Sequence, residues 1–181
     1  MSKAKSTGKY IVNKGHPALV KVARLISKEE IGSTKLNKVI HLMREELASQ
    51  DDGVAIAAPQ VGETIRMFVV APEAFHKNTK NFQTVYINPR ILKSSKEKEF
   101  MLEGCLSVRW LYGEVERSKQ IMIESLDEHG KRHVRGASGL MSQIFQHEID
   151  HLEGILFDTK AMDLQELPPE HLTGKAKKVN E

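Results

Sequence analysis

Two histidines four residues apart flank a glutamate in the segment His147-Glu148-Ile149-Asp150-His151. Residues four apart lie one turn apart on the same face of an α-helix, so both imidazoles can approach one metal ion. Glu148, next to the first histidine, is then able to act as a general base toward a water on that ion. The pattern predicts a hydrolytic metal site. Asp150 lies elsewhere around the helix, and we expect it to be solvated.

A catalytic metal ion usually has three protein ligands and one position open to water, so the two histidines need a third partner. One class of metalloprotease extends the same motif to a third histidine, but Phe157 stands at that position and cannot coordinate a metal. Another class takes a glutamate from a second helix; Glu166 and Glu170 are available, although the neighbouring Pro168-Pro169 disfavours a helix. A zinc endopeptidase with a different third ligand therefore stays open as an alternative.

An upstream candidate for the third ligand is Cys105, in the segment Glu103-Gly104-Cys105-Leu106-Ser107. A free cysteine is often a buried and inert thiol. Here it follows a glycine at the end of an expected strand, where a side chain can turn toward a site. Two histidines, one cysteinate and a water complete a four-coordinate ion. Two other interpretations remain at this point: a closed structural metal site in a binding module, and helix histidines that bind no metal.

The histidine motif needs a helix, and the period of the apolar residues becomes helical from about Ser138, with Gly154 as the stop signal. An earlier helix is expected over Thr34–Gln50, capped by Ser33. A short helix is expected over Pro17–Ile26. Apolar runs bounded by turn residues predict strands at Ile65–Ala71, Thr84–Ile87, Glu99–Leu102 and Ile121–Leu126, the last turning through Asp127–Gly130 into Lys131–Arg135.

This order of elements predicts an α+β domain, because the strands do not alternate regularly with helices as they do in a doubly wound sheet. We expect antiparallel β-sheets packed around the central metal-binding helix, with the helix at 34–50 covering one side. The predicted organisation is a flexible arm at residues 1–9, a single catalytic metallohydrolase domain at residues 10–158, and a polar, basic C-terminal tail at residues 159–181.

The composition is that of an ordinary globular protein, since 40% of the 181 residues are hydrophobic and 28% are charged. The formal net charge is only +3, with both signs mixed along the chain, which argues against DNA as a partner. The apolar runs are too short to span a bilayer, so no membrane partner is expected. A single cysteine fits a reducing compartment. The expected location is a bacterial-type cytoplasm, with an organelle as the open alternative.

Three short motifs, in order, resemble those of the peptide deformylase family. The first, Gly-x-Gly-x-Ala-Ala-x-Gln, is matched with one exception by Gly53–Gln60. The second, Glu-Gly-Cys-Leu-Ser, is matched in full by Glu103–Ser107, and the third, Gln-His-Glu-x-Asp-His-Leu, by Gln146–Leu152. The resemblance covers roughly residues 11–158. It implies hydrolysis of the N-formyl group from the initiator methionine of nascent polypeptides, with release of formate.

The resemblance also implies roles for particular residues. One divalent ion per chain would be held by Cys105, His147 and His151, and Glu148 would transfer the proton. The oxyanion would be stabilised by the side-chain amide of Gln60 and the backbone N–H of Leu106. The pocket for the formylmethionine would be formed by Ala55, Ile56, Leu140, Gln143 and Ile144.

The metal and the partners follow from the same resemblance. It implies iron(II) as the native metal, with zinc(II), nickel(II) or cobalt(II) as substitutes, a choice that affinity orders alone do not make. The implied substrate is an N-formylmethionyl peptide. A further hypothesis is that the basic stretch Gly174–Asn180 contacts ribosomal RNA; the simpler one is that this stretch is only solvated.

Four positions depart from the family pattern. Ala55 replaces the second glycine of the first motif, Arg109 and Trp110 stand where a proline and a small residue are usual, and Gln143 replaces an aliphatic residue. If the position of Ala55 requires a positive φ or a close backbone approach, its methyl group costs affinity. An inactive metal-binding relative is therefore a second alternative. Trp110 is expected to form either a substrate-facing wall or a packed residue of the core or rim.

Overall fold

The computed structural model describes residues 9–75 and 83–167 of the chain. Their elements, from the N-terminal side onward, are η1 (Pro17–Val20), α1 (Thr34–Ala48), β1 (Ala55–Ala57), η2 (Ala58–Val61), β2 (Met67–Val70), η3 (Pro72–Ala74), β3 (Val85–Ser94), β4 (Lys98–Cys105), β5 (Val108–Ser118), β6 (Gln120–Leu126), β7 (Arg132–Ser138), α2 (Gly139–Leu152), η4 (Phe157–Thr159) and β8 (Met162–Glu166), where η marks a short 3-10 helix.

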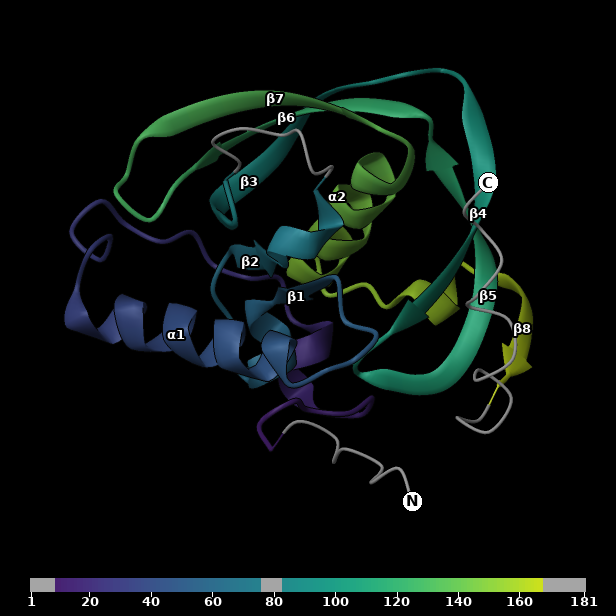
Figure 1. Cartoon of the computed structure of the whole chain (residues 1–181), viewed down its shortest axis with the longest axis horizontal. Helices are drawn as coiled ribbons and strands as arrows, with labels where there is room; N and C mark the ends of the chain where they lie inside the picture. The colour runs from purple at the N-terminus through teal and green to yellow at the C-terminus, as the bar shows by residue number, and fades with distance from the viewer. Residues whose placement is uncertain (1–8, 76–82, 168–181) are drawn as a thin grey trace.

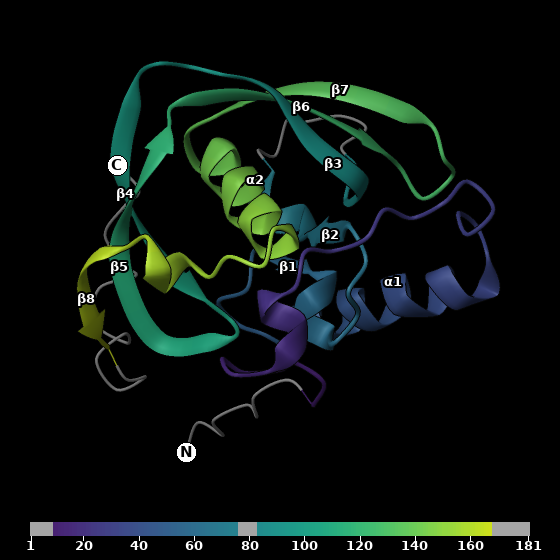
Figure 2. The same cartoon turned by 180° about the vertical axis from the view of Figure 1, so that it is seen from behind.

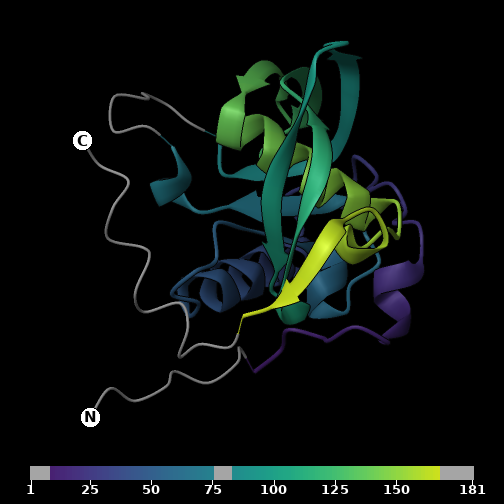
Figure 3. The same cartoon turned by 90° about the vertical axis from the view of Figure 1, so that its right-hand side faces the viewer.

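The strands form two antiparallel sheets on either side of α2. One sheet has the order β1-β2-β3-β6-β7 and the other the order β4-β5-β8. Figures 1 and 2 show α2 in the middle of the molecule, with β6 and β7 arching over it and α1 beside β1 and β2. In Figure 3 the strands β4, β5 and β8 lie in front of α2. The predicted α+β class, with antiparallel sheets around a central helix, is confirmed.

The helix α2 occupies the centre because it is apolar on the side that meets the larger sheet. Its residues Ile144, Phe145, Ile149 and Leu152 are buried in one cluster with side chains of β1, β2, β3 and β6. The ring of Phe145 lies 5.0 Å from that of Tyr86 and 5.8 Å from that of Phe68, between ring centroids. Burial of rings this large dominates core energetics. The packing therefore fixes the orientation of α2 and of the histidines that it carries.

The helix α1 begins where its sequence signal lies. The Ser33 hydroxyl accepts a hydrogen bond from the backbone N–H of Leu36, which is the capping interaction expected for serine at this position. The apolar stripe of α1 packs on the face of β1 and β2 that points away from α2, through Leu36, Ile40, Met43 and Leu47. Because successive side chains of a strand point to opposite faces, β1 serves two cores: Ala55 and Ala57 face α2, and Ile56 faces α1.

Several elements differ from the predictions. The helix predicted over 17–26 ends at Val20, since the following backbone bonds to other segments: the N–H of Ala23 donates to the carbonyl of Leu152, and that of Arg24 to Thr64. The strand β5 was not predicted, because its inward positions include Gly113 and Arg117 and so show no apolar alternation. The tail predicted at 159–181 contains β8, which pairs with β5, so the smaller sheet extends past residue 158.

Other parts of the sequence prediction lie outside the described residues, including residues 1–8 of the arm and the basic stretch at 174–180. Within the part of the chain that is described, no helix is long and apolar enough to cross a lipid bilayer.

Candidate metal centre

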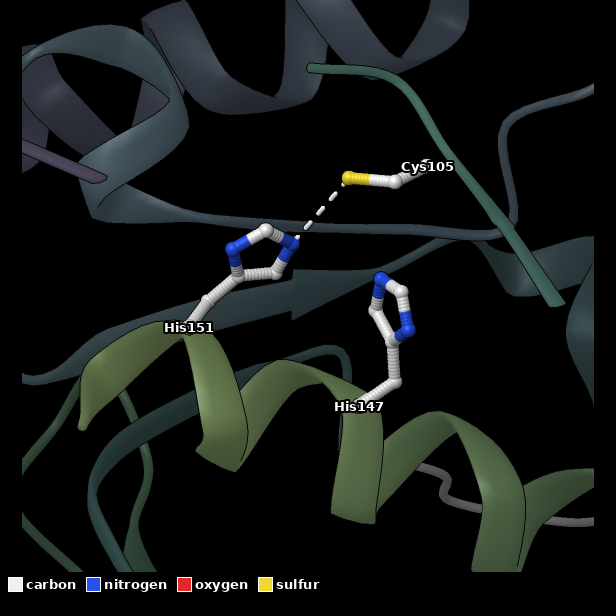
Figure 4. A group of neighbouring side chains, drawn as sticks. All are labelled: Cys105, His147 and His151. Atoms are coloured by element: carbon white, nitrogen blue, oxygen red, sulfur yellow. Dashed lines mark hydrogen bonds between the residues drawn. The ribbon is translucent and has the colours of Figure 1, made fainter. Parts of the chain in front are cut away.

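Three potential metal ligands converge where β4 ends above α2. Cys105 is the last residue of β4, and His147 and His151 project from one face of α2. Their ligand atoms all lie within 4.8 Å of one another, and the Cys105 Sγ is 3.2 Å from Nε2 of His151. Figure 4 shows the thiol and both imidazole rings directed into the same space. The three residues that the motif resemblance implied as ligands therefore lie together in the structure, whereas the residues alone had left the third ligand open.

The thiol is aimed by the end of the β4–β5 hairpin. Gly104 pairs with Tyr112, whose ring covers it so closely that a Cβ on Gly104 would lie 2.7 Å from the ring. Any larger residue would require the Tyr112 ring to move. Directly afterwards the strand register shifts, so that Cys105 pairs with Val108. A β-bulge of this kind bends a strand and redirects its side chains. The small Gly104 and the bulge after it thus help to place the sulfur over α2.

The donor set favours a deprotonated sulfur. Burial alone would raise the pKa of the Cys105 thiol, but the imidazoles of His151 and His147 lower it to about 5. For His147 the two effects have the opposite signs: burial would lower its pKa, but its hydrogen bonds to Cys105 and Glu103 raise that pKa well above the usual value. A thiolate between two imidazoles is the ligand chemistry that zinc or iron(II) accepts. These residues therefore fit a divalent transition metal.

A buried ion-pair network orients His147 from behind. Its Nδ1 lies 2.8 Å from Oε2 of Glu103, which leaves Nε2 directed toward the sulfur. Both oxygens of Glu103 also accept from Arg117, at 2.7 and 2.9 Å. Burial would raise the pKa of Glu103, but Arg117 and His147 lower it to about 2. Such a carboxylate behind a ligating histidine fixes its tautomer and ring orientation.

The network also includes Asp150, which the sequence interpretation placed in solvent; that expectation was wrong. Its carboxylate accepts from Arg117 at 2.6 Å and from Lys160 at 2.7 Å. Neither the role of Arg117 nor that of Glu103 was predicted. Arg117 stands in a charged stretch at residues 114–119, but its partners Glu103 and Asp150 lie 14 and 33 residues away in the sequence.

Glu148 differs from these paired carboxylates. It is buried at the wall of the same cleft, and its Oε2 has no hydrogen-bond partner among the described residues. Burial raises the pKa of Glu148 to about 7, against the opposing effect of the two nearby histidines. A carboxyl group with a pKa near neutrality can both accept and return a proton at physiological pH.

Gln60 is held with its amide group toward the sulfur. Its Oε1 accepts from the backbone N–H of Ala57 at 2.8 Å, which fixes the side-chain rotamer and the orientation of the amide. The Nε2 then lies 3.6 Å from Sγ of Cys105 and 3.3 Å from Oγ of Ser107. The η2 turn thereby presents an N–H donor beside the three ligands. Leu106, the other predicted donor, directly follows Cys105 and lines the same cleft.

A cleft leads from these groups to the surface between α2 and the β4–β5 hairpin. Four of the five predicted pocket residues line it: Ala55, Leu140, Gln143 and Ile144. Gln143 is tied to the opposite wall, since its Nε2 donates to the carbonyl of Leu102 at 2.8 Å. Ile56 lies apart from the cleft, fully buried against α1, because it is on the other face of β1. The sequence spacing alone did not reveal that strand alternation.

Comparison with known proteins identifies the family. The model of the polypeptide deformylase family matches residues 9–166. The chain belongs to the polypeptide deformylase family. The peptide deformylase of Christiangramia forsetii is 37% identical over 165 residues, which cover 86% of this chain and 82% of the relative. That of Treponema pallidum is 37% identical over 144 residues, covering 79% of this chain and 82% of the relative.

Solved deformylases have the same fold. The crystal structure of the Thermotoga maritima peptide deformylase superimposes with a TM-score of 0.73 at 36% identity, covering 84% of this chain and 96% of the other. A class I type b peptide deformylase from Acinetobacter baumannii, with the compound K3U bound, gives a TM-score of 0.76 at 34% identity, covering 83% and 97% of the two chains. The same bacterial enzyme has also been crystallised with Met-Ala-Ser.

The deformylase family is one of metal-dependent amide hydrolases that remove N-formyl groups, and the resemblance drawn from the three motifs is confirmed. The endopeptidase alternative is not favoured. The replacement of a family glycine by Ala55 also has a structural explanation. The φ angle of Ala55 is not in the positive range, and its methyl group packs in the cluster that includes Ile144. No left-handed backbone is required at that position.

Proposed function

We propose that Cys105, His147 and His151 hold one divalent metal ion at which the N-formyl group of a formylmethionyl peptide is hydrolysed. The observation that carries this proposal is the convergence of the three ligand atoms within 4.8 Å beside the buried Glu148. A bound divalent ion lowers the pKa of a water molecule and polarises a carbonyl group. The protein groups around it supply orientation, proton transfer and the exclusion of bulk water.

Glu148 is the proposed proton-transfer group. It takes the proton of the water that attacks the formyl carbon, and it returns this proton to the methionine nitrogen as the carbon–nitrogen bond breaks. The products are formic acid and a free amino terminus; the acid then loses its proton to the amine or to solvent and leaves as formate, so atoms and charge balance. The burial that raises the pKa of Glu148 to about 7 supports both half-steps.

The oxyanion that forms on the formyl oxygen is stabilised by two N–H donors in this proposal. One is Nε2 of Gln60, whose orientation is set by the hydrogen bond that the backbone N–H of Ala57 donates to Oε1 of Gln60. The other is the backbone N–H of Leu106. Loss of one such donor typically lowers kcat on the order of 10²–10³-fold.

The methionine side chain is proposed to enter the cleft beside His147, against Ile144 and Leu140. Ala55 forms the opposite wall, and its small size leaves room for the substrate. Gln143 makes this pocket more polar than an aliphatic residue would. The hydrogen bond from Gln143 to the carbonyl of Leu102 holds the side chain of Gln143 in one position. This side chain therefore forms a fixed wall of the pocket.

The native metal is proposed to be iron(II). The support is the His₂Cys donor set with a low thiol pKa, which also accepts zinc(II), nickel(II) or cobalt(II). Iron(II) with a cysteine ligand predicts loss of activity in air. Equal activity and equal metal content after aerobic and anaerobic purification would contradict the proposal that iron(II) is the native metal.

The place of action is proposed to be the cytoplasm, where formylated chains emerge from the ribosome. Contact with ribosomal RNA is proposed for the basic stretch at residues 174–180. Salt-sensitive ribosome binding that persists unchanged after truncation at residue 167 would remove this role from the tail.

The test of the function is formate release from formyl-Met-Ala-Ser by anaerobically prepared protein loaded with iron(II) or nickel(II). The wild type is expected to release formate, and Cys105→Ser is expected to lose both tight metal binding and turnover. Metal content measured beside activity separates the two effects. A fully metallated wild type that releases no formate would refute the proposal, and a Cys105→Ser variant with wild-type metal affinity would refute the ligand assignment.

A further inference from the structure

The β4–β5 hairpin carries a bulge that projects into the cleft. The register steps from Gly104↔Tyr112 directly to Cys105↔Val108. The three residues Arg109, Trp110 and Leu111 therefore lie between paired positions of β5, with no residue opposite them on β4. All three line the cleft that contains the metal ligands. Bulges next to active sites commonly redirect side chains toward the substrate.

Trp110 is in an unusual backbone conformation within this bulge. Its φ is 65°, in the left-handed region, which costs energy for a bulky residue and is normally occupied by glycine or asparagine. Neighbouring contacts maintain it: the carbonyl of Trp110 accepts from the N–H of Leu167 at 2.8 Å, and the flanking Leu111 pairs with Glu166 of β8. Non-glycine residues held in such conformations cluster at binding sites, because they serve a purpose that outweighs their energetic cost.

Arg109 holds this bulge against the other rim of the cleft. Its Nη1 lies 3.1 Å from both oxygens of Asp52, its Nη2 donates to Oε1 of Gln50, and its guanidinium carbon is 5.6 Å from the centre of the Trp110 ring. The charge of Arg109 is thus neutralised within the rim. Trp110 is partly buried and lines the cleft, as do the apolar or aromatic residues Leu102 and Tyr112.

We propose that Trp110 is a specificity-determining residue that binds large apolar or aromatic side chains in the two residues that follow the formylmethionine. This rests on the proposed function, because it assumes that the methionine occupies the pocket by His147. Arg109 is a positioning residue that keeps the indole at the rim through Asp52. The preferred substrates are formylated peptides with an aromatic second or third residue.

The kinetic test compares formyl-Met-Ala-Ser with formyl-Met-Phe-Ser and formyl-Met-Ala-Phe. The wild type is expected to show a kcat/KM for one phenylalanine peptide roughly three- to tenfold above that for formyl-Met-Ala-Ser, the range that aromatic stacking supplies. Trp110→Gly is expected to abolish this preference, and Trp110→Tyr to retain most of it. Asp163→Gly is the matched control, because Asp163 also has a left-handed φ, of 52°, but lies on β8 outside the lining of the cleft. It is expected to keep the wild-type preference.

A second measurement needs no variant, since Trp110 is the single tryptophan of the chain. The product peptide Met-Phe-Ser or Met-Ala-Phe is expected to shift tryptophan emission to shorter wavelength, and methionine alone to leave it unchanged. The proposal is overturned by an unchanged emission at saturating peptide, by an unchanged preference in Trp110→Gly, or by equal losses for all three peptides in that variant. Failure of the wild type to hydrolyse any of the three would instead refute the proposed function.

Discussion

Two buried regions meet at β1 and have opposite chemistry. On the α2 side lies the candidate metal centre, where Glu103, Arg117, Glu148 and His151 are all less than a tenth exposed. On the α1 side lies a cluster of aliphatic side chains that includes Met43, which is fully buried. Buried charges are costly unless they are paired, whereas buried aliphatic groups stabilise the fold. The comparison indicates that the apolar clusters on both faces of β1 supply the stability that offsets the cost of burying charged groups at the candidate metal centre.

The metal centre itself contains two kinds of carboxylate. Glu103 is fully paired, with a pKa of about 2, and Glu148 has an oxygen without a partner in the described residues and a pKa of about 7. The first behaves as a fixed anion that orients His147. The second is placed where it destabilises the folded protein and is available to react. Such pairs, whose environments separate their pKa values, are typical of catalytic sites.

The largest effect is expected from a substitution of Glu148, the carboxylate whose Oε2 has no partner among the described residues. Glu148→Gln keeps the shape but removes the proton-transfer group, so kcat for formyl-Met-Ala-Ser should fall by roughly 10²–10⁴-fold. Because the carboxylate is buried with an unpaired oxygen, the free energy of unfolding should stay the same or rise. Urea unfolding and metal content are measured beside kcat. A loss of stability above about 1 kcal/mol would show that Glu148 has a structural role, contrary to this assignment.

The opposite result is expected on the α1 side. Met43→Ala removes a fully buried side chain and should lower the free energy of unfolding by roughly 2–5 kcal/mol. Its kcat, measured well below the unfolding temperature, should match that of the wild type. The control is His41→Ala on the exposed face of the same helix, with an expected change within about 0.5 kcal/mol. A reduced kcat in the folded Met43→Ala protein would mean that the two regions are coupled through β1.

The two regions were also unequally predictable from the sequence. The α1 side follows local rules, a serine cap and a helical apolar stripe, and both were predicted correctly. The convergence of Cys105, His147 and His151 was predictable because the two histidines share one short motif and the cysteine lies in another. The ion-pair network that orients His147 was not predictable, because Arg117 joins Glu103 of a neighbouring strand to Asp150 of a helix. That Ile56 faces α1 and not the cleft depends on strand pairing, which a run of three residues does not reveal.

The smallest of these effects sharpens the distinction between orienting and reacting groups. Glu103→Gln keeps a hydrogen-bond acceptor but removes the anion behind His147, so metal affinity and kcat/KM should fall by roughly 10–100-fold. The matched control is Asp150→Asn, which also weakens a contact with Arg117 but does not touch a ligand. Its metal affinity, measured by competition with a chelator, should stay within about threefold of the wild type. Equal losses in both variants would mean that the whole charge network, and not the Glu103–His147 contact, holds the ligand in place.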